Sequence, residues 1–152
     1  MTPTTYRLAT IDDAAAIVEF QIAMARETED VELDLETCRK GVQAIFESSG
    51  LGQYYVAERN EKVIGSLLIT YEWSDWRNGM IWWVQSVYVI PEARGQRVYA
   101  GLYEHVKAIV EANENLRGIR LYVDERNKVA QQVYAKLGMN GEHYRVFEWM
   151  KS

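Results

Sequence analysis

The sequence predicts an α/β protein with a single mixed, mostly antiparallel sheet that carries helices on both faces. The first observation is the segment 53–90, in which β-branched and aromatic residues dominate, as they do in strands. The second is that apolar residues recur at helical spacing before and after this segment. The third is that no linker, repeat or low-complexity stretch divides the chain, so we expect one domain over residues 1–152.

Two helices are expected near the N-terminus, after a short first strand. Thr10 and Asp13 have the spacing of an N-cap with an acid in the first turn, which predicts a helix over 12–26. Its apolar stripe is predicted to comprise Ile11, Ala15, Val18, Ile22 and Ala25. Asp34 is expected to cap the second helix, which ends before Ser48.

Three antiparallel strands are expected next. The segments 53–59 and 62–73 are separated only by Asn60 and Glu61, so they predict a hairpin. After the turn "SDWRNG", the segment 80–90 is apolar on both of its faces. A strand that is covered on both faces is usually central, so we place this one inside the sheet.

Helices and strands alternate through the rest of the chain. A helix of about 15 residues is expected from Val98, followed by a strand over 118–124. A fourth helix begins near Asn127 and is closed by Gly138, a residue type that commonly ends helices. The segment 143–150, "HYRVFEWM", is expected to form the last strand.

Composition narrows the class of protein. The chain has 152 residues, 48% of them hydrophobic and 26% charged, which is typical of a globular protein. No apolar run is long enough for a membrane span and no leader pattern is present, so we expect a cytoplasmic protein without a membrane partner. The net charge of −5 disfavours nucleic acid as a partner and favours a cationic one.

Cysteine and histidine residues predict no metal site and no internal disulfide. Cys38 is the one cysteine, and no cluster with metal-ligand spacing accompanies it. We regard Cys38 as an unfavoured candidate nucleophile, because it lies on the apolar stripe of its helix with no histidine near it in sequence. His105 and His143 are assigned structural roles.

The turn between the strand over 80–90 and the following helix has the features of an anion site. A strand that enters a helix through a short glycine-containing loop directs the first N–H groups of that helix at one point, where the helix dipole is positive. Arg94, Gln96 and Arg97 add donors there, and Gly95 permits close approach of a ligand. A plain turn with solvated arginines is the alternative on this local pattern.

A second strand-to-helix segment carries an amide and a phenol. Asn127 and Tyr134 are seven residues apart, so both lie on one face of a helix. Alternatively, Asn127 is an N-cap and Tyr134 a half-buried core aromatic.

The two segments together, in this order, resemble the GNAT family, which transfers an acetyl group from acetyl-CoA to an amine. The first family pattern is matched at Val87, Val89, Pro91, Arg94 and Gly95. The second is matched at Asn127, Ala130, Tyr134, Lys136, Gly138 and Met139. The resemblance covers most of the chain, is strongest over 81–139, and implies the acyl-CoA N-acyltransferase fold. The chain departs from the family at Arg97 and Tyr99, where glycines are usual, which places cofactor affinity in question.

The resemblance implies a cofactor site and a general acid. Acetyl-CoA would be the co-substrate, with its pantetheine arm along "QSVYV". The implied cofactor contacts are Val87, Tyr88, Val89, Arg94, Gly95, Gln96, Arg97, Val98, Tyr99, Asn127 and Tyr134. Tyr134 would return a proton to the CoA sulfur. Where several relatives carry a glutamate this chain has Gln85, so we expect a water held by Gln85 or Glu72 to remove the amine's proton.

Acids and aromatics are candidates for binding the amine acceptor. "ETEDVELDLE" contains six carboxylates, and we single out Glu27 and Glu29 as attracting a cationic amine. Trp73 and Trp83 are candidates for stacking on the cation. The alternatives are a solvated loop for the acids, and sheet packing or a dimer face for the tryptophans.

The leading hypothesis is an N-acetyltransferase that acts on a primary amine of a small molecule, including polyamine-like ones. One alternative is a non-catalytic module that binds or senses acyl-CoA. Another is a ligand-binding domain that dimerises through its tryptophan-rich strands. A homodimer is an open expectation under each hypothesis.

Overall fold

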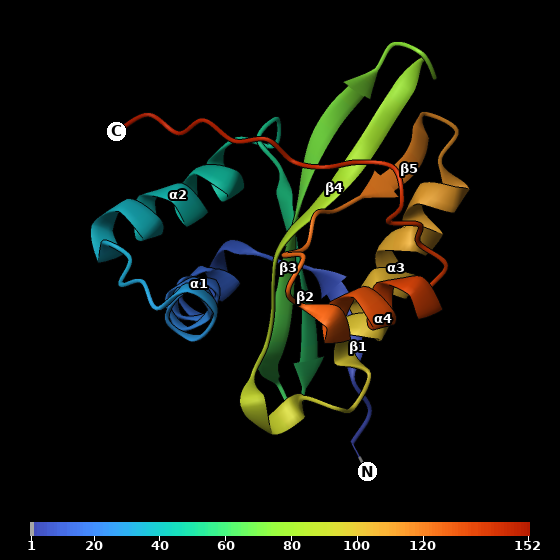
Figure 1. The fold of residues 1–152 in the computed structure, drawn as a ribbon. Coiled ribbons are helices and arrows are strands. Elements are labelled where there is room, and N and C mark those ends of the chain that lie inside the picture. The colour runs from blue at the N-terminus through green and yellow to red at the C-terminus, as the bar shows by residue number, and fades with distance from the viewer. Residues whose placement is uncertain (1) are drawn as a thin grey trace. The chain divides into compact units, whose positions relative to one another are not determined.

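The fold is seen in a computed structural model that describes residues 2–152 (Figure 1). The chain divides after Arg120 into two compact units, and the second unit is Leu121–Ser152. The expectation of a single domain over 1–152 stays a prediction.

The first unit contains the sheet and three of the four α-helices. Its elements in chain order are β1 (Thr5–Leu8), α1 (Ala14–Glu29), α2 (Leu35–Glu47), β2 (Gln53–Arg59), β3 (Lys62–Ser74), β4 (Gly79–Val89), α3 (Val98–Ala112) and β5 (Leu116–Arg120). The strands lie in the order β1-β2-β3-β4-β5. Every neighbouring pair is antiparallel except β4 and β5, which are parallel. The predicted mixed, mostly antiparallel sheet is therefore confirmed.

Helices cover both faces of this sheet (Figure 1). On one face Tyr54 and Val56 pack in a cluster with Ile17 of α1 and Val42 of α2. On the other face Tyr55 contacts His105 of α3, with ring centroids 5.7 Å apart. Successive strand residues point to opposite faces, so β2 contributes to both layers of the core.

The predicted apolar stripe of α1 is confirmed at its last three residues and wrong at its first two. Val18 and Ala25 are buried and Ile22 packs against the core, whereas Ile11 and Ala15 are exposed. Ile11 lies in a short 3₁₀ turn, Ile11–Asp13, and the α-helix starts only at Ala14, so α-helical spacing does not extend to Ile11. The side chains buried by α1 are Ile17, Val18, Phe20, Gln21 and Ala25. A glutamine therefore lies on the buried face.

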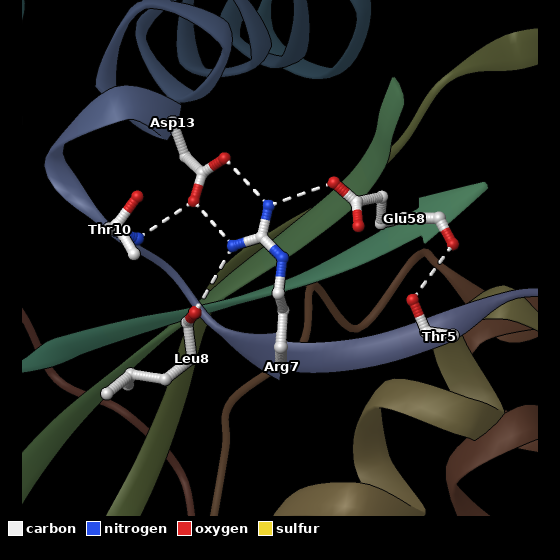
Figure 2. A network of polar contacts seen from close by, with 6 residues as sticks. All are labelled: Thr5, Arg7, Leu8, Thr10, Asp13 and Glu58. Carbon is white, nitrogen blue, oxygen red and sulfur yellow. Dashed lines mark hydrogen bonds and ion pairs between the residues drawn. The ribbon is translucent and has the colours of Figure 1, made fainter. Parts of the chain in front are cut away.

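The start of α1 is fastened to the sheet by a network of charges (Figure 2). Arg7 donates to both oxygens of Asp13, at 2.8 and 3.0 Å, and to Glu58 at 3.1 Å. Asp13 also accepts from the backbone N–H of Thr10 at 2.8 Å. The Arg7 guanidinium lowers the pKa of Asp13, which keeps this nearly buried carboxylate charged.

Both predicted strand connections are confirmed. Asn60 and Glu61 have φ of 53° and 61°, the left-handed pair that a tight two-residue hairpin requires. Asn78, with φ of 50°, closes the turn between β3 and β4. These turns set the register of β2, β3 and β4.

The second unit contains α4 (Lys128–Lys136), and the helix ends before Gly138, which has φ of 91°. The predicted last strand over 143–150 is wrong, because this segment has no regular structure. Its alternating pattern gives only a propensity, and a strand forms when a partner strand completes its hydrogen bonds. Phe147 and Trp149 are 93% and 86% exposed. The predicted strand over 118–124 is also shorter in the structure, where it is β5.

Residues 2–152 contain neither a candidate membrane span nor a candidate metal site. None of the helices within residues 2–152 is long and apolar enough to cross a membrane. Within the same residues, no three His, Cys, Asp or Glu side chains are arranged to hold a metal ion.

Candidate active site

β4 has a free backbone edge along its second half. It pairs with β3 from Gly79 to Val89, but with β5 only from Met80 to Trp83. In the described part of the first unit, no strand pairs with residues 84–89 on the β5 side. An unpaired edge exposes N–H and C=O groups to which an extended ligand can add like another strand.

A β-bulge lies in this free part of β4. Ser66 pairs with Tyr88 and Leu68 with Gln85, so two β4 residues face one β3 residue. Ser86 is one of them and has φ of 51°, in the left-handed region. A bulge releases a backbone group from the ladder and bends the strand, features often found beside active sites.

The turn after β4 leads to the N-terminus of α3. Gly95 and Arg97 both have positive φ, 76° and 62°. Glycine adopts this conformation without cost, whereas Arg97 does not, which explains physically why glycine suits that position. Arg97 is the N-cap residue of α3 and makes no side-chain capping hydrogen bond. The dipole and N–H groups of α3 are thus directed at a turn with no side-chain cap.

Arg94 is held in this turn by three contacts. Its Nε donates to the carbonyl of Val89 at 2.9 Å, and its Nη2 donates to Glu27 at 3.0 Å. Its guanidinium lies over the ring of Tyr88, 5.4 Å from the centroid. Hydrogen bonds from Tyr88 and then from Arg94 lower the pKa of Glu27. The structure thus brings together four residues that the sequence singled out.

The other predicted cofactor residues of this turn already contact neighbouring residues of the protein. Gln96 accepts from Arg59 at 2.6 Å and donates to the carbonyl of Glu92 at 3.0 Å. Val98 is buried, and Tyr99 lies beside Tyr103 with ring centroids 6.4 Å apart.

Gln85 and Glu72, the predicted holders of a proton-carrying water, are also hydrogen-bonded. Gln85 donates to the hydroxyl of Thr70. Glu72 accepts from the indole of Trp83 at 2.9 Å and from Arg120 at 2.8 Å. The donation from Trp83, followed by that from Arg120, lowers the pKa of Glu72. A carboxylate held in this way is a weak base.

The two candidate tryptophans do not lie together. Trp83 contacts Glu72, and Trp73 is the next residue along β3, so strand alternation places Trp73 on the opposite face of the sheet. Trp73 lines a separate hollow of about 440 Å³ near the β3–β4 turn, together with Trp82. One acceptor cannot stack on both Trp73 and Trp83.

Most of the acidic run is already partnered. Glu32 is ion-paired with Arg26 at 2.6 Å, and Glu36 with Arg39 at 2.6 Å. Glu27 is held by Arg94, as described above, while Asp34 caps α2 by accepting from the N–H of Thr37 at 2.9 Å. Glu29, the other candidate, is exposed. Paired carboxylates attract a cation less strongly than free ones.

In the second unit, Asn127 is the N-cap of α4. Its Oδ1 accepts from the backbone N–H of Ala130 at 3.0 Å. Tyr134 lies seven residues later in the same helix and is half-buried. The N-cap interpretation of Asn127 is therefore confirmed, and the expected helix from Asn127 to Gly138 is present.

A hollow of about 320 Å³ that the sequence does not predict lies in the first unit, on the α1 and α2 face of the sheet. Gln21, Cys38, Tyr54 and Ser86 line it, among others. A signal for Gln21 was available, because it lies four residues after Ile17 and four before Ala25, both of which are buried. Nothing local marks Tyr54 or Ser86.

Comparisons with known proteins point to one family. The model of the acetyltransferase (GNAT) family matches residues 15–139. A possible acetyltransferase from Clostridium difficile 630 is 38% identical, with 98% of each chain covered and a TM-score of 0.91. No curated protein matches the sequence closely enough to count as a relative.

More distant structures share the fold. A predicted acetyltransferase from Clostridium acetobutylicum, solved with acetyl-CoA, is 18% identical, with 99% of this chain and 96% of that one covered and a TM-score of 0.73. An aminoglycoside N-acetyltransferase in complex with CoA is 15% identical, with the same coverage and a TM-score of 0.77. Since the family model spans most of the sequence, this chain belongs to the acetyltransferase (GNAT) family of acyltransferases.

Proposed function

We propose that the protein transfers an acetyl group from acetyl-CoA to a primary amine of a small molecule. The observation that carries the proposal is the free edge of β4 from Val84 to Val89, which leads directly into the turn at Arg94 and the N-terminus of α3. An extended arm that ends in phosphates matches both parts of this site. The β4 edge offers main-chain hydrogen bonds to the arm, and the N-terminus of α3 offers a positive potential to the phosphates.

In this proposal the pantetheine arm adds to β4 at Val87 and Val89, and the pyrophosphate lies at Gly95, Gln96 and Arg97. Arg94 is the candidate charge partner for the phosphates. Because Glu27 already holds Arg94, the cofactor would have to compete with this carboxylate. Val98 and Tyr99 belong to the first turn of α3, and the ring of Tyr88 packs against the guanidinium of Arg94.

The chemistry requires a neutral amine, a polarised carbonyl and a proton for the departing thiolate. Backbone N–H groups at the bulge near Ser86 are candidates for polarising the acetyl carbonyl. Tyr134 is proposed as the general acid that protonates the CoA sulfur. A water bound near Gln85 is our candidate for accepting the amine's proton, since Glu72 is occupied by Trp83 and Arg120.

A thermal melt with and without acetyl-CoA tests the cofactor part of this proposal. A site filled to about 100 times its dissociation constant stabilises the protein by about 2.7 kcal/mol, which raises Tm by several degrees. Desulfo-CoA serves as a control, because it keeps the phosphates and lacks the thioester. No shift with either compound would contradict the proposed cofactor site.

Release of CoA with a panel of primary amines then separates an enzyme from a non-catalytic acyl-CoA-binding module. We expect release with at least one amine. Binding without release for every amine would favour the non-catalytic alternative. A cytoplasmic location and a homodimer remain predictions, and the second is decided by light scattering after size-exclusion chromatography.

A further inference from the structure

The hollow of about 320 Å³ in the first unit has one charged side chain on its lining. This is the carboxylate of Asp34, the N-cap residue of α2. Glu27 and Glu29, the acids that the sequence singled out, do not line the hollow, and among the described residues neither does any lysine or arginine. A ligand in the hollow therefore meets a negative potential.

Asp34 keeps one of its two oxygens for a ligand. Its Oδ2 accepts from both the N–H and the hydroxyl of Thr37, at 2.9 and 2.7 Å. Within residues 2–152, its Oδ1 accepts no hydrogen bond and no arginine or lysine pairs with the carboxylate. The hydrogen bonds from Thr37 lower the pKa of Asp34, so it is charged at neutral pH. Glu32 and Glu36 differ in this respect, because each is paired with an arginine.

The rest of the lining is mainly apolar or neutral. Leu33 and Val42 contribute aliphatic side chains, and Tyr54 contributes its ring. Burial raises the pKa of Tyr54 to about 12 and also raises the pKa of the Cys38 thiol, so both groups are neutral at physiological pH. A short aliphatic chain in the hollow would cover these apolar surfaces.

The hollow also adjoins the free edge of β4. Ser86 is on its lining and is the left-handed residue of the β4 bulge. In the proposed function the acetyl carbonyl lies at this bulge. A ligand that fills the hollow can therefore contact both the reacting carbonyl and Asp34, and all of these residues belong to the first unit.

We propose that the hollow selects a linear diamine as the acceptor, with one amine at the β4 bulge and the distal ammonium on Oδ1 of Asp34. This inference rests on the proposed function and names its substrate class, with Asp34 as the specificity-determining residue. The near amine reacts as the neutral base. Its nitrogen forms the C–N bond to the acetyl group as the C–S bond breaks, the nitrogen loses a proton, and the thiolate of CoA gains one. The distal amine stays charged and is not acetylated.

Three amines of equal chain length test the proposal. They are 1,5-diaminopentane, pentylamine and 5-aminopentan-1-ol, which end in an ammonium, a methyl group and a hydroxyl. With acetyl-CoA present, we expect kcat/KM from CoA release to be at least about tenfold higher for the diamine than for the other two, as a charge-assisted hydrogen bond predicts. This exceeds the statistical advantage that the diamine has from its two equivalent amines.

Asp34→Asn assigns the preference to one charge. Asparagine and aspartate are equally good N-caps, so the variant loses the charge and keeps the cap of α2. We expect the diamine preference to fall to the statistical advantage, while Tm and the acetyl-CoA melt shift stay unchanged. Glu36→Gln is the matched control and should keep the preference. It removes a charge from the same turn, but Glu36 is paired with Arg39 and lies outside the lining.

Gly41→Phe tests whether the chain of the ligand fills the hollow. Gly41 lines the hollow and an added Cβ meets no atom within 4 Å, so a ring can be placed there. We expect kcat/KM to fall for the diamine and for pentylamine alike. Gly50→Phe is the control, since Gly50 has the same open space and lies outside the lining. Unchanged kcat/KM in Gly41→Phe would contradict the proposal.

The outcomes distinguish this inference from the proposed function. If CoA is released and pentylamine is as good an acceptor as the diamine, the inference is overturned and the proposed function stands. A diamine preference that survives Asp34→Asn would also overturn the inference. If no amine releases CoA, the proposed function fails, and saturation-transfer NMR of 1,5-diaminopentane with the protein in the presence of CoA decides the inference. Weaker binding to Asp34→Asn than to the wild type would then support it, and equal binding would overturn it.

Discussion

α3 and α4 both begin after a turn, but their first turns are completed differently. At α4, the side chain of Asn127 accepts a hydrogen bond from the N–H of Ala130 at 3.0 Å. At α3, the preceding residue is Arg97, held at φ of 62°, and no side chain caps the helix. A side chain thus satisfies one backbone N–H in the first turn of α4, whereas no side chain does so in α3.

The difference indicates which turn is suited to an anion. A capped helix has used a donor of its first turn on its own chain, so its cap contributes to stability. An uncapped helix keeps its dipole and donors for a partner from outside, and phosphate groups fit that role. The turn before α3 is therefore our proposed anion site, and Tyr134 in α4 remains the proposed general acid.

The largest expected effect tests the chemical role of α4. Tyr134→Phe removes only the phenol oxygen, so we expect kcat for CoA release to fall by about 10²- to 10⁴-fold with an unchanged melting temperature. The KM for acetyl-CoA should stay within a few fold. Wild-type turnover across the measurable pH range would remove Tyr134 from the mechanism.

The next effect tests the anion role of the turn before α3. Arg94→Gln removes a charged donor, so we expect the KM for acetyl-CoA to rise about 10- to 100-fold, as the loss of a charge-assisted hydrogen bond predicts. Arg117→Gln is the control, because Arg117 donates to the carbonyl of Arg77 at 3.1 Å near the β3–β4 turn. An equal change in both variants would indicate a general charge effect.

Asn127→Ala tests the capped turn. Loss of an N-cap side chain should lower the free energy of unfolding by about 1 kcal/mol, measured by urea denaturation. The KM for acetyl-CoA should not change. If KM rises while stability does not, Asn127 contacts the cofactor, as the family resemblance implies, and the comparison of the two turns is wrong.

Arg97→Gly tests the strain in the uncapped turn. Glycine relieves the cost of the left-handed conformation but adds chain entropy to the unfolded state, so we expect a net gain of only about 0.5–1 kcal/mol in stability. Thermal denaturation measures it. A loss of stability would mean that contacts of the Arg97 side chain outweigh the strain.

The smallest expected effect concerns the contact between Glu27 and Arg94. Glu27→Gln removes the competing carboxylate, so we expect acetyl-CoA to bind about two- to fivefold more tightly at low salt, with the gain lost at high salt. The pKa of Glu27 is lowered in the folded protein. The ion pair is therefore fully formed above the ordinary pKa of glutamate, and it breaks only when the pH falls through the lowered pKa. Weaker binding by the variant would show that Glu27 assists the cofactor.

Local patterns predicted the elements that local physics controls. The hairpin was predicted because only Asn60 and Glu61 separate two strand-like segments, and the structure forms a tight turn there. Val98 begins α3 as expected, and Gly138 follows the end of α4. The segment 143–150 failed, because its strand pattern says nothing about whether a partner strand is present.

The candidate site depended on more than pattern. Glu27 was singled out as one acid of an exposed run, and the structure pairs it with Arg94, 67 residues away. Gln21 is absent from the predicted apolar stripe because it is polar, although the structure buries it on the same helix face as Ile17 and Ala25. The contact between Glu27 and Arg94 does not follow from spacing along the chain.

The sequence by itself determined the order of helices and strands from β1 to α4, the two hairpin turns and the family. These features depend on backbone preferences and short-range periodicity, which neighbouring residues encode. The tertiary structure alone decided that Arg94 meets Glu27, that Trp73 and Trp83 lie on opposite faces, and that Gln21, Tyr54 and Ser86 line one hollow. Such contacts join residues distant in sequence, and only the packing of helices against a sheet of defined register brings them together.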